Sequence, residues 1–437
     1  MTNNVNNTSK IVQSLDQSYW GIVKRQFKKN KLAVYSLKFV YFIVFVGFFA
    51  DFLASDKPLY CTINDNSYFP IFRTYLVNLG VAKFPTDMAQ VNWAETTFET
   101  EIRTLIPYSP QYMDLKNKDY VSPFDNQDIT SFRWRHWLGT DNLGRDVMAG
   151  MIHGTRTAML VGIISMSIST LIGIIFGAIA GYFGDRGLQM SRIRFWLNIA
   201  FFFIGLWYAF FVRSYHLSSA LSNGLGLFFL QLILSLIILS FFLLLANLIA
   251  VPLKKIPALG MRVNVPVDIM ISRLIEIKVA IPTMLLILSI VAVMKSPSVL
   301  LVMVIIGLTS WTGIAKYTRA ELLKVRSLEY IDAAQALGYS RIRTIFRHAL
   351  PNSLSAVLVA VAFGIAGAIL LESSLSFLGI GVRPEDVTWG SMITGARGYF
   401  KAWWLAIFPG LAIFLTVTIF NLLGEGLTDA MDPRLKQ

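Results

Sequence analysis

Long runs of uncharged apolar residues constrain this chain more than any other feature of its sequence. Residues 195–212 and 224–251 contain no Asp, Glu, Lys or Arg. A helix needs about 20 apolar residues to cross the hydrocarbon core of a bilayer. In lipid, only helices and closed barrels satisfy all their backbone hydrogen bonds, and barrel strands alternate polar with apolar residues. The sequence therefore predicts an all-α polytopic membrane protein.

Further apolar runs bring the expected spans to eight. They cover residues 33–52, 158–182, 268–294, 299–314, 353–378 and 403–423. Composition agrees, because 55% of the 437 residues are hydrophobic and only 15% are charged, against about 25% charged in a soluble domain. The first run is longer than the core of a secretory signal and lacks a small-residue cleavage site, so we expect a retained helix.

The positive charge of the chain lies in short loops. The formal net charge is +13, and basic residues concentrate at 24–31, 184–194 and 254–262, beside apolar runs. Cytoplasmic loops of membrane proteins carry this bias, so we expect no nucleic-acid partner and place both termini in the cytoplasm. Residues 55–150 are instead polar with a slight acidic excess, which predicts an external (periplasmic) segment, a small irregular domain.

Several kinds of chemistry are excluded by what the sequence lacks. There is one cysteine, Cys61, and the four histidines are far apart and outside any H-E-x-x-H pattern. These observations exclude an intrachain disulfide framework and predict no metal site. No G-x-x-x-x-G-K-[ST] loop occurs, so this chain cannot bind ATP in the P-loop manner. We also find no nucleophile or metal constellation for a membrane-embedded enzyme and expect no catalytic residue and no cofactor.

A polar, basic stretch lies between two apolar runs, from Glu329 to Pro351. It predicts a first helix over 328–337, because Gly338 stands where a helix end prefers glycine. Ser340 can cap a second helix, which Pro351 ends because proline lacks the N–H of an interior position. Spacing places two sets of side chains on opposite faces of this helix: Ile342, Ile345, Phe346 and Ala349 against Arg341, Arg343 and Arg347. On the residues alone, an ordinary cytoplasmic connection between spans fits equally well.

The spacing of Asp332-Ala333-Ala334, Gly338 and Leu350-Pro351 resembles the EAA loop of bacterial ABC-importer permeases. Two positions depart from the motif, because Asp332 stands where Glu is usual and His348 where many members have Ile. In that family the loop is the coupling helix that docks on the ATPase subunit. The resemblance therefore implies ATPase-coupling roles for nine residues: Glu329, Tyr330, Asp332, Ala333, Ala334, Gly338, Arg341, Leu350 and Pro351.

Other segments extend this resemblance. HWLGTDNLGRD, from His136 to Asp146, is similar to the start of the permease core in dipeptide and oligopeptide importers, as is Gly154-Thr155-Arg156. On the residues alone, its glycines and aspartates predict a tight turn that leads into a helix start. RHALPN at 347–352 resembles the peptide and nickel branch in particular. LSFLGIG at 375–381 and Trp389-Gly390 resemble the importer family. The resemblance covers residues 134–185 and 268–435, and 30–54 more weakly.

The resemblance implies a type I permease fold with six core transmembrane helices in the bacterial inner membrane. It implies a second, related permease subunit, two ATPase subunits that bind ATP and Mg, and an external substrate-binding protein. Membrane lipid is the remaining partner, and Arg341, Arg343 and Arg347 contact either its phosphates or the ATPase. The implied activity is import of di- or oligopeptides by alternating access. An importer of nickel or another small solute and a non-transporting membrane scaffold are the alternatives.

The resulting division of the chain has six parts. A cytoplasmic segment (1–32), a first transmembrane helix (33–54) and the external segment (55–150) come first. The permease core starts at 151–194 and resumes at 253–437, with coupling helices at 328–350. Residues 195–252 break the family pattern and are expected to form an inserted transmembrane hairpin, which either faces lipid or binds a partner.

Two details of the spans complete the expectations. An ionisable residue within a span marks a functional site by default, so Glu372 and Ser373 are candidates for the substrate pathway. The alternative is that Glu372 is a solvated or hydrogen-bonded residue at a helix end. Pro282 predicts a kink in the span at 268–294, where Arg273 and Glu276 form an i,i+3 pair.

Overall fold

A computed structural model describes residues 19–63, 66–85, 91, 93, 96, 98–223, 225–293, 298–381, 383 and 385–431. These residues form two compact units. Unit 1 comprises Met1–Thr170, Pro297–Trp311 and Ser355–Gln437, and unit 2 comprises Leu171–Ser296 and Thr312–Leu354. Several parts of the predicted elements lie outside the described residues: 1–18 of the N-terminal segment, 64–65, 86–90, 92, 94–95 and 97 of the external segment, Gly224 of the hairpin, and 294–297, 382, 384 and 432–437 of the permease core.

Within the described ranges, seven helical segments are long and apolar enough to cross a membrane, and each coincides with a predicted span. The eighth predicted span, 268–294, is instead a bent pair, α12 (Val267–Ala280) and α13 (Thr283–Val293). The two helices meet at an angle of 79°. The predicted kink at Pro282 is confirmed, but it is a full break, because proline interrupts the backbone ladder. The chain has eight spans if this pair counts as one.

Several helices extend beyond the predicted apolar runs. Helix α7 (Val147–Ala178) begins before residue 158, and α14 (Val299–Val325) continues past residue 314. The last span, α19 (Trp404–Met431), also runs on past residue 423. Polar flanks remain helical outside the hydrocarbon region, and an apolar pattern alone does not detect them.

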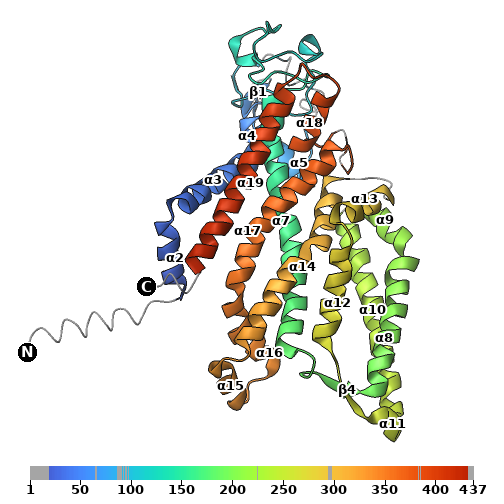
Figure 1. Ribbon diagram of the computed structural model, residues 1–437. Helices are drawn as coiled ribbons and strands as arrows, with labels where there is room; N and C mark the ends of the chain where they lie inside the picture. Colours follow the sequence, from blue (N-terminus) through green and yellow to red (C-terminus); the bar gives the residue numbers. More distant parts are fainter. Residues whose placement is uncertain are drawn as a thin grey trace, which may run out of the picture. The chain divides into compact units, whose positions relative to one another are not determined.

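Unit 1 holds both ends of the described chain (Figure 1). It contains α2 (Tyr19–Lys29), α3 (Lys31–Phe48), α4 (Ala50–Leu53), α18 (Trp389–Arg397) and most of α17 (Leu350–Phe377). In Figure 1, α3 in blue lies beside α19 in red. They approach closely, since a Cβ on Gly426 would stand 2.2 Å from the Cβ of Ala33. Small residues allow such close helix packing in lipid.

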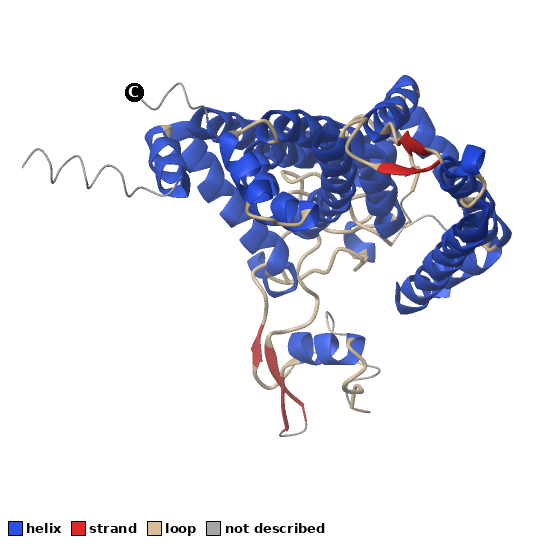
Figure 2. Ribbon diagram, turned by 90° about the horizontal axis from the view of Figure 1, so that it is seen from below, coloured by secondary structure: helices blue, strands red, loops and turns tan. Residues whose placement is uncertain are grey.

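The segment between α4 and α7 is mostly loop. Its strands β1 (Tyr60–Ile63), β2 (Asn66–Tyr68) and β3 (Glu101–Ile102) form an antiparallel sheet in the order β2-β1-β3, with Cys61 opposite Tyr68 and Tyr60 opposite Ile102. Figure 2 shows this sheet as the longer red ribbon. The described residues of this segment also form three short helices: α5 (Pro70–Asn78), η1 (Leu115–Asn117) and η2 (Phe132–Trp134).

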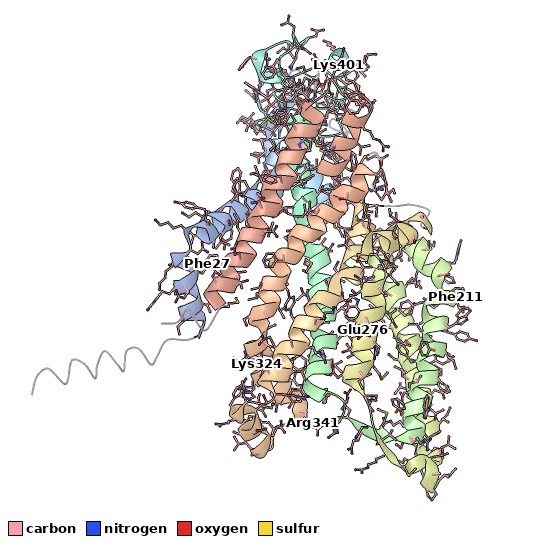
Figure 3. The ribbon with its side chains drawn as sticks, in the orientation of Figure 1. Phe27, Phe211, Glu276, Lys324, Arg341 and Lys401 are labelled. Carbon is pink, nitrogen blue, oxygen red and sulfur yellow. The ribbon has the colours of Figure 1, made fainter. Side chains whose placement is uncertain are left out.

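Unit 2 contains the predicted hairpin. Its first arm is α8 (Arg192–Leu206) with the π-helical turn η4 (Trp207–Val212), and its second is α10 (Leu225–Leu253). The short α9 (Ser214–Asn223) joins the arms, and α11 (Pro257–Gly260) follows them. The arms lie side by side in Figure 1, and Tyr208 stacks on Phe242 with ring centroids 5.4 Å apart. Outward side chains such as Phe211 are exposed (Figure 3).

A two-stranded ribbon closes the base of this hairpin. Strand β4 (Gln189–Ser191) precedes α8, and β5 (Arg262–Asn264) follows α11. They pair antiparallel, with Ser191 opposite Arg262. The chain therefore enters and leaves the hairpin at adjacent backbone positions.

Candidate functional site

The predicted helix–turn–helix is present in unit 2. Its first helix, α15 (Glu329–Ala336), ends where the sequence predicts. Gly338 has a left-handed φ of +81°. The N–H of Gly338 donates to the carbonyl of Gln335 at 2.9 Å, and that of Tyr339 to Ala334 at 3.2 Å. This pair of bonds is a Schellman motif, which satisfies the last carbonyls of a helix.

The second helix begins as predicted but does not end as predicted. The Ser340 side chain accepts a hydrogen bond from the N–H of Arg343 at 3.4 Å and caps α16 (Arg341–Thr344). The prediction that Pro351 ends this helix is wrong, because the helix continues through η5 (Ile345–Ala349) into α17. η5 is a π-helical turn. A wider turn just before a proline accommodates the lost hydrogen bond and the bulk of the ring.

One face of this segment is buried within unit 2. Ile331 of α15 and Ile345 and Ala349 of η5 form a cluster with α14 and the end of α7. Leu322 and Val325 contribute from α14, where Leu322 is fully buried. Ala178 and Tyr182 contribute from α7 and the π-helical turn η3 (Ile179–Phe183) that follows it. Because close-packed apolar side chains transmit displacement, α15 cannot move independently of α14 and η3.

The opposite face carries large apolar side chains on the surface. Leu337, Ile342 and Phe346 are 75%, 67% and 67% exposed. The prediction that Ile342 and Phe346 share one face with Ile345 and Ala349 is therefore wrong, because Ile345 and Ala349 are buried. Thr344, which the apolar pattern passes over, takes the inward position and is fully buried. Packing against α14 sets the rotation of this short helix, and its own sequence does not reveal that.

The coupling candidates divide between these faces. Ala334 is only 5% exposed, so it packs inward, whereas Asp332, Ala333 and Gly338 lie on the surface. The side chain of Tyr330 is tied to the start of α17, since Asn352 donates to its hydroxyl at 3.1 Å. Leu350 packs against the buried cluster. The remaining candidates, Glu329, Arg341 and Pro351, are exposed.

Polar bonds fix the ends of the segment within unit 2. The Arg341 guanidinium donates to the carbonyl of Gly187, and Arg326 donates to that of Gly181 at 3.3 Å. Figure 3 shows Arg341 and Lys324 at the end of unit 2 that carries α15. The Tyr339 ring stacks on the His348 ring with centroids 5.7 Å apart. The guanidinium carbon of Arg343 lies 4.8 Å from the centroid of the Tyr339 ring. His348, a departure from the motif, thus has a packing role that its sequence position does not indicate.

In unit 1, the segment from His136 to Asp146 forms the predicted turn and helix start. Gly139 and Gly144 have left-handed φ values of +80° and +79°. Oδ1 of Asp146 accepts a hydrogen bond from the N–H of Ala149 at 2.7 Å, in the first turn of α7. The aspartate therefore satisfies a free backbone donor at the helix N-terminus.

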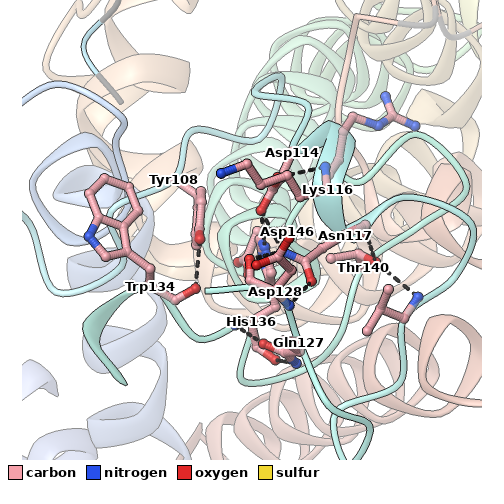
Figure 4. A network of polar contacts seen from close by, with 12 residues as sticks. Tyr108, Asp114, Lys116, Asn117, Gln127, Asp128, Trp134, His136, Thr140 and Asp146 are labelled. Carbon is pink, nitrogen blue, oxygen red and sulfur yellow. Dashed lines mark hydrogen bonds and ion pairs between the residues drawn. The ribbon is translucent and has the colours of Figure 1, made fainter. Parts of the chain in front are cut away.

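Asp146 also belongs to a buried polar network that the sequence does not predict (Figure 4). Nδ1 of His136 lies 2.8 Å from Asp146, and Nε2 lies 3.2 Å from Asp114. Burial disfavours the charged imidazole, but the two carboxylates outweigh it and hold the pKa of His136 above its usual value. Burial likewise opposes ionisation of Asp114, but hydrogen bonds from His136 and Asn117 keep its pKa low.

Glu372 and Ser373 are buried, at 1% and 6% exposure. Ser376 donates to the Glu372 carboxylate at 2.5 Å, and Ser373 lies 3.4 Å from it. Thr388, which also caps α18, supplies a third hydroxyl. Glu372 is therefore a buried carboxylate held by three hydroxyls, and its contact with Thr388 links α17 to the start of α18.

A pocket of about 420 Å³ lies beside this cluster in unit 1. Its wall includes Ser376, the hydroxyl donor to Glu372. It also carries two ion pairs, Asp141 with Arg145 at 2.7 Å and Arg383 with Asp386 at 3.3 Å. Both signs of charge are therefore presented to one cavity. Among the described residues, no group of three His, Cys, Asp or Glu side chains could hold a metal ion.

Comparison with known families identifies the family to which this chain belongs. Residues 256–437 match the family described as the binding-protein-dependent transport system inner membrane component. Residues 18–70 match the N-terminal transmembrane domain of oligopeptide transport permease C. The chain is a permease of the peptide-type ABC importers. As such a permease it is a multi-pass inner-membrane subunit without a catalytic role of its own, and the family binds no cofactor in this subunit.

Individual relatives of this permease agree. It is 27% identical over 436 residues to the peptidoglycan transport system permease protein YejE of Agrobacterium fabrum, covering 94% of this chain and 92% of the relative. The di/tripeptide permease DppC of Pseudomonas aeruginosa is 28% identical, covering 72% and 82%. The glutathione permease GsiD of Pectobacterium atrosepticum is 29% identical, covering 72% and 81%.

Proposed function

We propose that this permease imports di- or oligopeptides and that two partner ATPase subunits hydrolyse the ATP. A second, related permease subunit completes the pathway, and an external binding protein delivers the substrate. The observation that carries the proposal is the two-faced α15–η5 segment. Its outer face is exposed, and its inner face packs on α14 and η3.

The exposed face suits a docking partner. Leu337, Ile342 and Phe346 present apolar surface among Asp332, Arg341 and other charged side chains. Apolar side chains with a charged rim are typical of protein interfaces. The proposal adds six coupling candidates to this surface: Glu329, Tyr330, Asp332, Ala333, Gly338 and Arg341. It gives a supporting role to the other three: Ala334, Leu350 and Pro351.

Coupling follows from the buried face. When the ATPase moves, α15 moves with it and carries Ile331 along. The packed cluster transmits this displacement to Leu322 of α14 and Tyr182 of η3. The ATPase shifts the equilibrium of the permease only if it binds the inward-open and outward-open states with different affinity. Because the packed cluster connects α15 firmly to α14 and η3, the position of α15 differs between the two states. An ATPase docked on α15 can therefore bind the two states with different affinity.

We place α15 and both termini in the cytoplasm. The bent pair α12–α13, counted as one span, gives six crossings between the N-terminal segment and α15. An even number returns the chain to its starting side, and both ends carry basic residues, as in cytoplasmic segments. Asn30, at the start of α3, donates to Asp429 near the end of α19 at 3.3 Å, so the two ends lie together.

The peptide substrate is supported by the pocket in unit 1. A peptide carries an ammonium and a carboxylate, and the pocket presents carboxylates and guanidinium groups in one cavity. We propose that it forms part of the outer entrance. Glu372 and Ser373 then act on the pathway by positioning Ser376 in the pocket wall. The broad coverage of the peptidoglycan permease favours one second candidate, a peptide fragment of peptidoglycan.

Transport by the complete, reconstituted transporter tests the proposal. Proteoliposomes holding both permeases and the ATPases, with the binding protein outside and ATP inside, receive a labelled tripeptide. We expect ATP-dependent uptake that unlabelled peptide abolishes and Ni²⁺ leaves unchanged. Uptake of a labelled muropeptide that unlabelled tripeptide does not reduce would select the peptidoglycan fragment. Absence of uptake for peptide, muropeptide, glutathione and Ni²⁺ in an assembled complex would favour the scaffold alternative.

A further inference from the structure

The base of the α8–α10 hairpin contains a second pocket, of about 590 Å³, which belongs entirely to unit 2. Five elements line it: strands β4 and β5, the start of α8, the end of α10 and the short α11. Its charged lining residues are all basic: Arg194, Lys254, Lys255 and Arg262. Among the residues that the structure describes, no carboxylate lines it, in contrast to the mixed-charge pocket of unit 1.

These four cations are available to a ligand. Each is exposed, and among the described residues none of them forms an ion pair. The Nε of Arg194 donates to the side-chain oxygen of Asn247, a neutral acceptor that leaves the positive charge uncompensated. Several like charges around one cavity repel one another unless an anion binds among them.

The backbone fixes these cations in one place. The β4–β5 ladder pairs Ser191 with Arg262, and the N–H of Arg192 donates to the carbonyl of Met261 at 2.9 Å. Arg262 is thereby held at the start of α8, close to Arg194. The two arms are joined by Asn198 and Asn247, whose side chains bond at 3.1 Å. The site is therefore formed by the fold and does not depend on mobile side chains alone.

An apolar wall leads away from the cations along α10. Leu244, Leu248 and Val251 line the pocket and are 64%, 67% and 51% exposed. Their spacing of four and three residues places them on one helix face. In a hairpin long enough to cross the bilayer, this face lies at the depth of lipid acyl chains. A free anion would use the cations and leave the wall uncovered.

We propose that this pocket binds an anionic phospholipid. The phosphate lies among Arg194, Lys254, Lys255 and Arg262, and one acyl chain lies along Leu244, Leu248 and Val251. Basic pockets between transmembrane helices bind such headgroups at the membrane surface. The ligand would hold the hairpin at a fixed depth beside the permease core, which gives residues 192–261 a function beyond facing lipid.

Lipid titration of the detergent-solubilised full chain, followed by native mass spectrometry, tests the proposal. Phosphatidylglycerol and phosphatidylcholine are compared, with inorganic phosphate as a competitor. We expect phosphatidylglycerol to bind at least about tenfold more tightly than phosphatidylcholine, and Lys254→Gln with Lys255→Gln to remove this preference. The matched control, Lys28→Gln with Lys29→Gln, changes another adjacent basic pair at the end of a helix and should keep it.

Three outcomes would overturn the proposal. One is equal binding of the two lipids, and another is an equal loss of preference in the control pair, which would indicate general surface attraction. The third is full competition by phosphate at the affinity of the lipid, which would indicate a free-anion site. If the glutamine pair does not fold, Arg262→Gln is compared with the same control instead, and it should likewise reduce the preference for phosphatidylglycerol.

Discussion

The guanidinium of Arg319 holds the carboxylate of Asp268 through two hydrogen bonds, one of them 2.7 Å long. The contact joins α14 to the first turn of α12, across 51 positions of sequence. Both groups are partly exposed, with 33% and 15% of their side-chain surface accessible. Helix α14 also carries the buried cluster under α15, so this ion pair ties the coupling segment to the bent pair α12–α13.

Breaking this ion pair should weaken the link. We expect Arg319→Gln to destabilise unit 2 by about 1–2 kcal/mol, because bidentate charged hydrogen bonds are strong but these groups are partly solvated. Asp268→Asn should cost the same, and the double variant little more than either single variant. Thermal unfolding of all four proteins in detergent measures this. Additive losses would show that the two side chains do not act together.

Gly338 should resist replacement because of its backbone conformation. At φ +81°, a β-branched side chain costs at least about 1–2 kcal/mol, so Gly338→Val should loosen the end of α15. Nothing lies within 4 Å of a Cβ at this position, so any loss comes from the backbone. Gly338→Asn is the control, since asparagine tolerates this region. Stimulation of the partner ATPase by substrate should fall with valine and persist with asparagine; equal activity would remove the role of the turn.

Gly177 should be intolerant of even one methyl group. An added Cβ would stand 2.6 Å from the carbonyl oxygen of Ala315 and from the Cβ of Thr318. Overpacking of this kind costs about 1–3 kcal/mol, so Gly177→Ala should lower the unfolding temperature. Gly313→Ala on α14 is the matched control, because nothing lies within 4 Å of its added Cβ. A similar loss for both variants would mean that α7 and α14 do not pack this closely.

The network around His136 should make the stability of the segment at residues 108–146 depend on pH. Since the folded pKa of His136 is raised, its contribution is complete below the usual value near 6.5 and is lost as pH rises through the folded value. Since the pKa of Asp114 is lowered, its contribution is present above 3.8 and is lost as pH falls through the folded value. Stability should therefore be greatest at mildly acidic pH.

Hydrogen exchange of the segment at residues 108–146, measured across this pH range, checks the prediction. His136→Asn should expose the segment to faster exchange and abolish the loss at higher pH. Protection that stays equal at all pH values in the wild-type chain, after correction for the intrinsic pH dependence of exchange, would mean that protonation of His136 is not linked to the stability of this segment.

Local signals predict much of the structure. The sequence correctly predicts the helix end at Gly338, the helix cap at Ser340 and the turn before α7, because caps and turns depend on nearby residues. The apolar runs located each span. These features need no knowledge of the tertiary fold.

Long-range packing explains the remainder. Burial of Ala334 and exposure of Ile342 depend on which side meets α14, and a four-residue helix such as α16 has no periodicity to reveal it. His136, Asp114 and Asp146 are brought together by loops, and Ser191 meets Arg262 across the whole hairpin. The continuation of the helix through Pro351 depends on the π-helical turn before it.

The most direct test of the account places single cysteines on the two faces of α15. In a chain with Cys61→Ala, one variant carries Ala333→Cys on the exposed face and the other Ala334→Cys, which is buried. Each is assembled with its partner permease and ATPases and treated with a short thiol-to-amine crosslinker. The account predicts a nucleotide-dependent crosslink to the ATPase from position 333 and none from 334. No crosslink from 333 in an assembled, transporting complex would contradict the coupling role of α15.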